Sequence, residues 1–134
     1  MQWIVIALIV LHVVSGVFWA GSSFVLARTG GLLVEKLAGP QFGAGVATLC
    51  MGLATWFLAL RGLPPTAGMH VLGAGAACAA LALIVQGTAL PTVRTLKAAE
   101  GDLSSQRRRV AISQRVAAVL LFLTVLAMAS WSHV

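Results

Sequence analysis

Four long runs of apolar residues, separated by shorter segments that hold almost all of the charge, make up this sequence. A helix that crosses a bilayer needs about 20 mostly apolar residues, and its backbone polar groups must be paired within the helix. The runs therefore predict four spanning helices, at residues 3–27, 43–60, 67–90 and 116–131. We expect one all-α integral membrane domain over residues 1–134, folded as a transmembrane four-helix bundle.

The basic residues between the runs indicate how these helices would lie in a membrane. Segments 28–42 and 91–115 would emerge on the same face, because the chain crosses the membrane twice between them. They carry eight of the nine basic residues, and segment 61–66 carries only Arg61. Basic residues favour the cytoplasmic side. The bias predicts that both termini lie outside (N-out/C-out) and that the two long connections face the cytoplasm of a bacterial inner membrane.

The composition limits the classes of function. The chain is 60% hydrophobic and 9% charged, whereas soluble domains have roughly 45–50% apolar and about 25% charged residues. An ordinary water-soluble domain is therefore excluded. The net charge of +6 would suit nucleic acid, but the basic residues flank apolar runs, where they meet anionic headgroups. We expect the lipid bilayer, and no nucleic acid, as a partner.

Two histidines within the predicted helices are candidate functional residues, because ionisable groups are rare and costly inside a membrane. At about 1.5 Å per residue, His12 would lie roughly 13 Å and His70 roughly 6 Å below the outer surface. The face of the first helix that carries His12 is otherwise polar or small, and we expect it to point into the bundle. Its other members are Ser15, Gly16, Trp19, Ser22 and Ser23.

Each histidine also has a purely structural alternative. His12 could hydrogen-bond a backbone carbonyl or a hydroxyl of the second helix, where Thr48 and Thr55 lie on a polar stripe. His70 could be a partly hydrated residue at the membrane interface, close to the Pro64-Pro65 turn. Both alternatives stay open at the level of sequence.

Neutral imidazole binds haem iron and copper, so the two histidines are candidate cofactor ligands. For a b-type haem, His12 and His70 would be the axial ligands, and Trp19 shares the face of His12. Gly73, with the alanines that follow it, would leave a shallow groove beside His70 for a flat macrocycle. The glycines could equally serve close helix packing.

Copper is the alternative cofactor, since it also accepts thioether ligands. Met51 lies at the predicted depth of His12, and Met128 at that of His70, so both methionines are candidate metal ligands. Methionine is also a common filler of apolar cores.

The first and last helices resemble those of one family of membrane proteins. Leu11-His12 is followed by Trp19-Ala20-Gly21, a Leu-His pair with Trp-x-Gly seven residues after the histidine, and residues 115–129 form a comparable final helix. In these residues the chain resembles the CopD-like integral membrane proteins, and the haem-dependent HemJ-type protoporphyrinogen oxidases are similar in layout. The resemblance implies a bundle of four or more helices with His12 as a cofactor ligand.

The leading hypothesis is an inner-membrane protein that binds b-type haem and transfers electrons or assists a redox enzyme. A copper-binding or copper-uptake protein is the first alternative. A cofactor-free assembly subunit is the second, and it would dock a partner membrane redox protein or a second copy through its Gly/Ala faces. The sequence assigns no catalytic residue.

Overall fold

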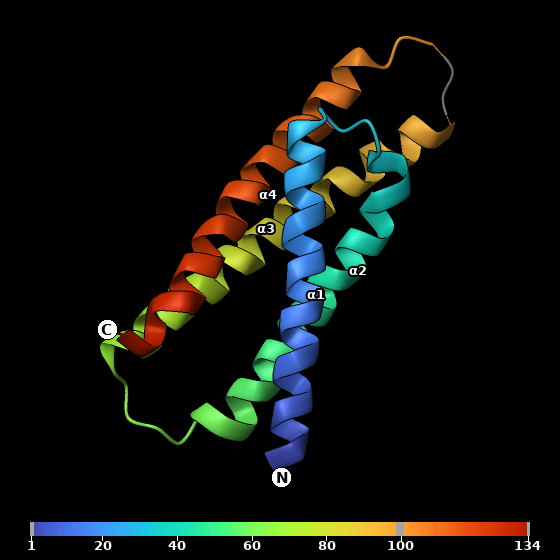
Figure 1. Cartoon of the computed structure of the whole chain (residues 1–134). Coiled ribbons are helices and arrows are strands. Elements are labelled where there is room, and N and C mark those ends of the chain that lie inside the picture. The colour runs from blue at the N-terminus through green and yellow to red at the C-terminus, as the bar shows by residue number, and fades with distance from the viewer. Residues whose placement is uncertain (1, 99–100, 134) are drawn as a thin grey trace.

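The chain folds into four long helices joined by short connections (Figure 1). The computed structural model describes residues 2–98 and 101–133, and all regular structure within them is helical. The helices are α1 (Gln2–Arg28), α2 (Val34–Thr55), α3 (Ala67–Ala98) and α4 (Ser104–Ser130). A π-helical turn, η1 (Trp56–Leu60), extends α2, and a 3-10 turn, η2 (Trp131–His133), follows α4. In the described residues, four helices are long and apolar enough to cross a membrane, which confirms the prediction of an all-helical fold with four long apolar helices.

Three predicted helix boundaries are wrong, two of them because a proline lies inside a helix rather than at its end. α2 begins at residue 34 instead of 43 and continues through Pro40. α3 continues through Pro91 to residue 98 instead of ending at 90, and α4 begins at 104 instead of 116. A proline removes one backbone hydrogen bond, but the bundle buries residues on both sides of each. These are Ala38, Gln41, Ala89 and Val93. Packing therefore keeps both helices continuous.

The described residues at the ends of two connections have specific local chemistry. Gly30 follows α1 with a φ of 62°, a left-handed conformation that glycine adopts without a steric penalty. Before α4, the Asp102 carboxylate accepts the backbone N–H of Ser104 at 3.0 Å. That hydrogen bond, and a second one from the Ser104 hydroxyl, lower the pKa of Asp102 below its ordinary value. Asp102 therefore joins the end of the connection to the first residue of α4.

Most buried residues recur at spacings that alternate between three and four along each helix. They are Trp19, Ser23 and Leu26 on α1, Val34, Ala38, Gln41, Gly45 and Thr48 on α2, Gly75, Ala79, Ala82, Gln86, Ala89, Val93 and Leu96 on α3, and Val110, Gln114, Ala117, Leu121 and Thr124 on α4. The average repeat is about 3.5 residues, which is typical of left-handed helical bundles. Each helix therefore contributes one stripe to a common interior.

The helices form two hairpins, α1–α2 and α3–α4. α1 packs on α2 and α4, and α3 packs on the same two helices, so α1 and α3 stand across the bundle from each other. Figure 1 shows the hairpins meeting near the α1–α2 and α3–α4 connections and diverging toward the ends that carry the termini. The fully buried residues of α1 all lie between residues 19 and 26. The closely packed part of the bundle is therefore the end with these connections.

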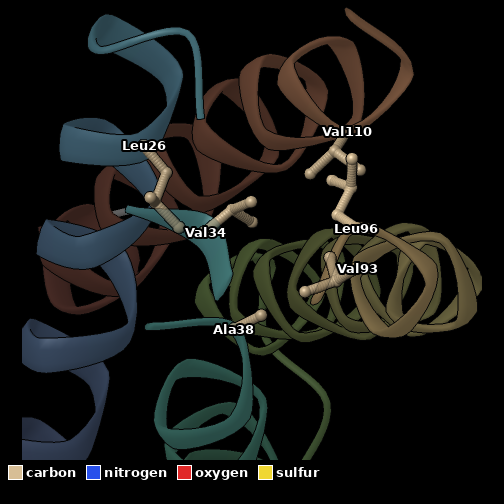
Figure 2. Close-up of a cluster of buried hydrophobic side chains, with 6 residues drawn as sticks. All are labelled: Leu26, Val34, Ala38, Val93, Leu96 and Val110. Carbon is tan, nitrogen blue, oxygen red and sulfur yellow. The ribbon is translucent and has the colours of Figure 1, made fainter. Parts of the chain in front are cut away.

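Two apolar clusters form this packed end. The first cluster, drawn in Figure 2, lies nearest the connections and consists of Leu26, Val34, Ala38, Val93, Leu96 and Val110. The second lies deeper and consists of Trp19, Ala79, Ala82, Ala117 and Leu121. Along each helix, a buried polar residue falls between the two clusters. They are Ser23, Gln41, Gln86 and Gln114.

Gly45 allows the indole of Trp19 to lie directly against α2, and this contact yields a prediction. A Cβ at Gly45 would lie 2.7 Å from Trp19 Cε2 and 2.7 Å from Leu83 Cδ1, whereas a Cβ at Gly43 would meet nothing within 4 Å. We expect Gly45→Ala to lower the free energy of unfolding by about 1–3 kcal/mol through overpacking. Gly43→Ala, the matched control, should raise it by up to about 1 kcal/mol, because alanine favours the helix. Unfolding in detergent followed by circular dichroism measures both, and equal effects would contradict this packing.

Candidate functional site

A layer of five buried polar side chains connects all four helices. Each is at most 4% exposed: Trp19 and Ser23 on α1, Gln41 on α2, Gln86 on α3 and Gln114 on α4. All five are uncharged, so the layer places hydrogen-bonding groups in the interior without the cost of burying a charge.

Two acceptors at the centre of this layer are shared by two glutamine amides. Gln41 Nε2 donates to Ser23 Oγ at 2.8 Å and to Gln114 Oε1 at 3.1 Å. Gln86 Nε2 donates to the same two oxygens, at 2.9 and 3.4 Å. Both N–H groups of each amide are therefore engaged, and one serine and one glutamine on opposite hairpins hold α2 and α3 together.

Further hydrogen bonds close the network. Trp19 Nε1 donates to Gln86 Oε1 at 2.6 Å, and Gln114 Nε2 donates to Gln41 Oε1 at 3.2 Å. The Ser23 hydroxyl donates back to the carbonyl of Trp19 at 2.8 Å. Within residues 2–98 and 101–133, every buried side-chain nitrogen and oxygen has a hydrogen-bond partner. The layer thus directs its polar groups at one another and serves to join the helices.

Sequence reasoning missed the three glutamines of this layer. Gln41 and Gln114 lay within segments that were expected to be connections. Gln86 lay within a predicted helix but is uncharged, and only ionisable residues were taken as candidates there. One signal in the sequence could have found them. Each glutamine continues the three-and-four spacing of small and apolar residues on its helix, which places it on the interior stripe.

His12 lies farther along α1 and contacts α2. Its Nδ1 is 2.8 Å from the carbonyl oxygen of Thr48. Because a carbonyl only accepts, Nδ1 is the donor in this contact, and Nε2 is the ring nitrogen that takes no part in it. A Cβ at Gly52 would lie 2.9 Å from His12 Cε1, so only glycine lets the half-buried ring sit this close to α2. The carbonyl bond that sequence analysis left open for His12 is therefore present.

Two hydroxyl groups, those of Ser15 and Thr48, lie near His12. The Ser15 and Thr48 hydroxyl oxygens are 2.9 Å apart, which joins α1 to α2 one turn below the imidazole. Ser15 Oγ also donates to the carbonyl of Leu11 at 2.7 Å. This pair keeps Thr48 in place and, with it, the carbonyl that orients the ring.

The other predicted site residues are distributed over all four helices. His70 and Gly73 are exposed on α3, which stands across the bundle from α1, and a Cβ at Gly73 would meet nothing within 4 Å. Met51 is half-buried on α2 and Met128 is half-buried on α4. Trp19 donates its indole N–H to Gln86 rather than to a group beside His12. In the part of the chain that the structure describes, no three His, Cys, Asp or Glu residues gather as a metal site.

Comparisons with known proteins add no family to this picture. No protein-family model matches the chain, and no curated protein or solved structure matches it either. The resemblance to the CopD-like proteins, which rests on the first and last helices, therefore stays a prediction.

Removing one glutamine tests the layer. Gln86→Leu deletes the acceptor of the Trp19 indole and two donors, so buried groups on the other helices lose their partners. We expect a loss of about 1–3 kcal/mol in the free energy of unfolding, the usual cost of an unpaired buried group. The control is Gln2→Leu at the exposed start of α1. A titration with denaturing detergent compares them, and a Gln86→Leu protein as stable as the control would refute the layer.

Proposed function

We propose that this chain is a multi-pass protein of the bacterial inner membrane that binds b-type haem through His12 and transfers electrons or assists a redox enzyme. The observation that carries the proposal is the 2.8 Å contact between His12 Nδ1 and the Thr48 carbonyl. Metal-ligating histidines commonly donate their second ring N–H to a carbonyl, which sets the tautomer and aims the other nitrogen at the metal. His12 has that arrangement, with Nε2 as the donor atom.

The two axial ligands expected from the sequence, His12 and His70, lie on helices that stand across the bundle from each other. His12 faces α2 through Thr48 and Gly52, whereas His70 is exposed on the helix diagonal to α1. The proposal therefore keeps His12 and omits His70. A bound haem iron would supply one-electron transfer. The residues of the chain would orient the imidazole and keep it partly shielded from water.

The same imidazole could bind copper instead of haem iron, which is a variant of this proposal. The thioether groups of Met51 and Met128 remain predicted copper ligands. A cofactor-free assembly subunit is the second candidate. It is favoured by the closed hydrogen bonding of the polar layer and by the small residues Gly73, Ala74 and Ala77 on an exposed face of α3. Small residues allow helices in a membrane to approach closely.

The proposed orientation places the connections of the packed end in the cytoplasm and both termini outside. Eight of the nine basic residues lie at or near the packed end, which suits the cytoplasmic side. Trp3, Trp56 and Trp131 all lie near the opposite ends of their helices. Tryptophan concentrates at membrane interfaces, so these three suit the outer surface.

Replacing each histidine tests the cofactor proposal. We expect protein purified from its native membrane in mild detergent to show a haem Soret band, and His12→Ala to lose most of it. His70→Ala is the matched control and should keep it, because His70 is exposed on α3. Absorption spectra and metal analysis measure haem and copper together. Full haem content in His12→Ala contradicts the ligand assignment, stoichiometric copper favours the copper variant, and neither cofactor favours the assembly subunit.

A glycine variant tests whether the position of the His12 imidazole matters while the imidazole itself is kept. Gly52→Ala adds a Cβ that would lie 2.9 Å from His12 Cε1, so the ring must move. We expect this variant to lower the haem content or shift the Soret band while remaining folded. Gly73→Ala is the control, since its Cβ would meet nothing within 4 Å. Identical spectra in both variants would contradict a role for the ring's position.

Labelling of introduced cysteines tests the orientation. In a protein carrying Cys50→Ala and Cys78→Ala, we expect Ser132→Cys to react with an impermeant thiol reagent in intact cells. Ser104→Cys should react only after the membrane is opened, because it lies at the basic end of the bundle. The reverse pattern would place the termini in the cytoplasm.

A further inference from the structure

Basic side chains gather on the α3–α4 hairpin near its connection. Residues 91–115 include six basic and two acidic residues. Arg107 is paired with Glu35 of α2 at 2.8 Å, and Asp102 is engaged with Ser104. The two arginines that follow Arg107 are exposed. A positive surface therefore remains at this end after the internal pairing is taken into account.

Two shallow hollows adjoin each other on this surface and share Ser105 and Arg109. One is lined by Ser104, Ser105, Arg108, Arg109 and Ile112. The other is lined by Pro91, Thr92, Thr95, Ser105, Gln106 and Arg109. The Ser105 hydroxyl donates to Gln106 Oε1 at 2.8 Å, which leaves the amide N–H groups of Gln106 as donors. Arginine guanidinium groups and a glutamine amide thus line this open surface.

An apolar track leads away from these hollows along α4. Its members are spaced by four and three residues and are each 44–61% exposed: Ile112, Val116, Val119, Leu123 and Leu126. This stripe faces outward, on the side of the helix opposite the interior stripe. An amphiphile with its anionic group at Arg109 would therefore find a continuous hydrocarbon surface for its acyl chain.

We propose that the surface around Arg109 binds the phosphate headgroup of an anionic phospholipid, with an acyl chain along the apolar track. An arginine fork pairs with phosphate oxygens in a bidentate way, and basic pockets on the cytoplasmic side of membrane helices suit anionic headgroups. The apolar track favours a lipid over free phosphate, because phosphate has no hydrocarbon chain to pack against it. The inference rests on the proposed membrane placement but is independent of His12 and its cofactor.

Native mass spectrometry of the full chain in detergent tests the site, with phosphatidylglycerol and phosphatidylcholine added at equal concentration. We expect the wild type to retain phosphatidylglycerol in preference to phosphatidylcholine. Arg109→Gln should weaken the retention of phosphatidylglycerol about fivefold, the effect of removing one basic group near anionic lipid. The matched control is Arg61→Gln, an exposed arginine at the opposite end of the bundle, which should change little.

Three results would overturn the proposal. They are equal retention of the two lipids, an Arg61→Gln effect as large as that of Arg109→Gln, and displacement of phosphatidylglycerol by millimolar inorganic phosphate. Repeating the titration in His12→Ala separates this site from the cofactor proposal, because lipid retention should be unchanged there. Circular dichroism confirms that each variant is folded.

Discussion

Buried amide groups must find hydrogen-bond partners within the protein, and this requirement governs how the four helices meet. In an apolar interior an unpaired donor or acceptor costs free energy that packing cannot recover. Gln41, Gln86 and Gln114 each come from a different helix, and Ser23 comes from the fourth. Sliding any helix by one turn, about 5.4 Å, would remove its group from the layer. The layer therefore fixes the register of the bundle as well as its stability.

The position of the layer also explains why the two ends of the bundle differ. It lies between two apolar clusters at the end with the α1–α2 and α3–α4 connections, where all four helices contribute. Beyond it, the helices are held in pairs. His12 bonds to Thr48 between α1 and α2, and Thr124 donates to the Gly75 carbonyl between α4 and α3 at 3.1 Å. His12 thus belongs to the paired region, where its ring is only half-buried.

The sequence predicted the helices well and their polar interior poorly, for identifiable reasons. Apolar run length found all four helices, and the expected inward face of α1 contains the buried Trp19 and Ser23. The rule that a proline ends a helix misplaced two boundaries, at Pro40 and Pro91, because tertiary packing outweighed it. The start of α4 was misplaced because its first turns are polar and basic rather than apolar. Intramembrane ionisable residues were taken as candidate functional residues, which selected His12 but not the uncharged glutamines. The sequence left two kinds of hydrogen-bond partner open for His12, a backbone carbonyl and a hydroxyl. Thr48, whose carbonyl is the observed partner, lies 36 residues away along the chain, so only the packing of α1 on α2 decides between them.

A double-mutant cycle between Trp19→Phe and Gln86→Leu tests the central claim most directly, that the helices are joined by hydrogen bonds of the buried layer. Trp19→Phe removes the indole N–H that Gln86 accepts at 2.6 Å. The account predicts a coupling of about 0.6 kcal/mol, and at most about 1.7, the range measured for such bonds between membrane helices. Trp56→Phe, in the exposed turn after α2, should show no coupling to Gln86→Leu. Additive effects of Trp19→Phe and Gln86→Leu would contradict the account.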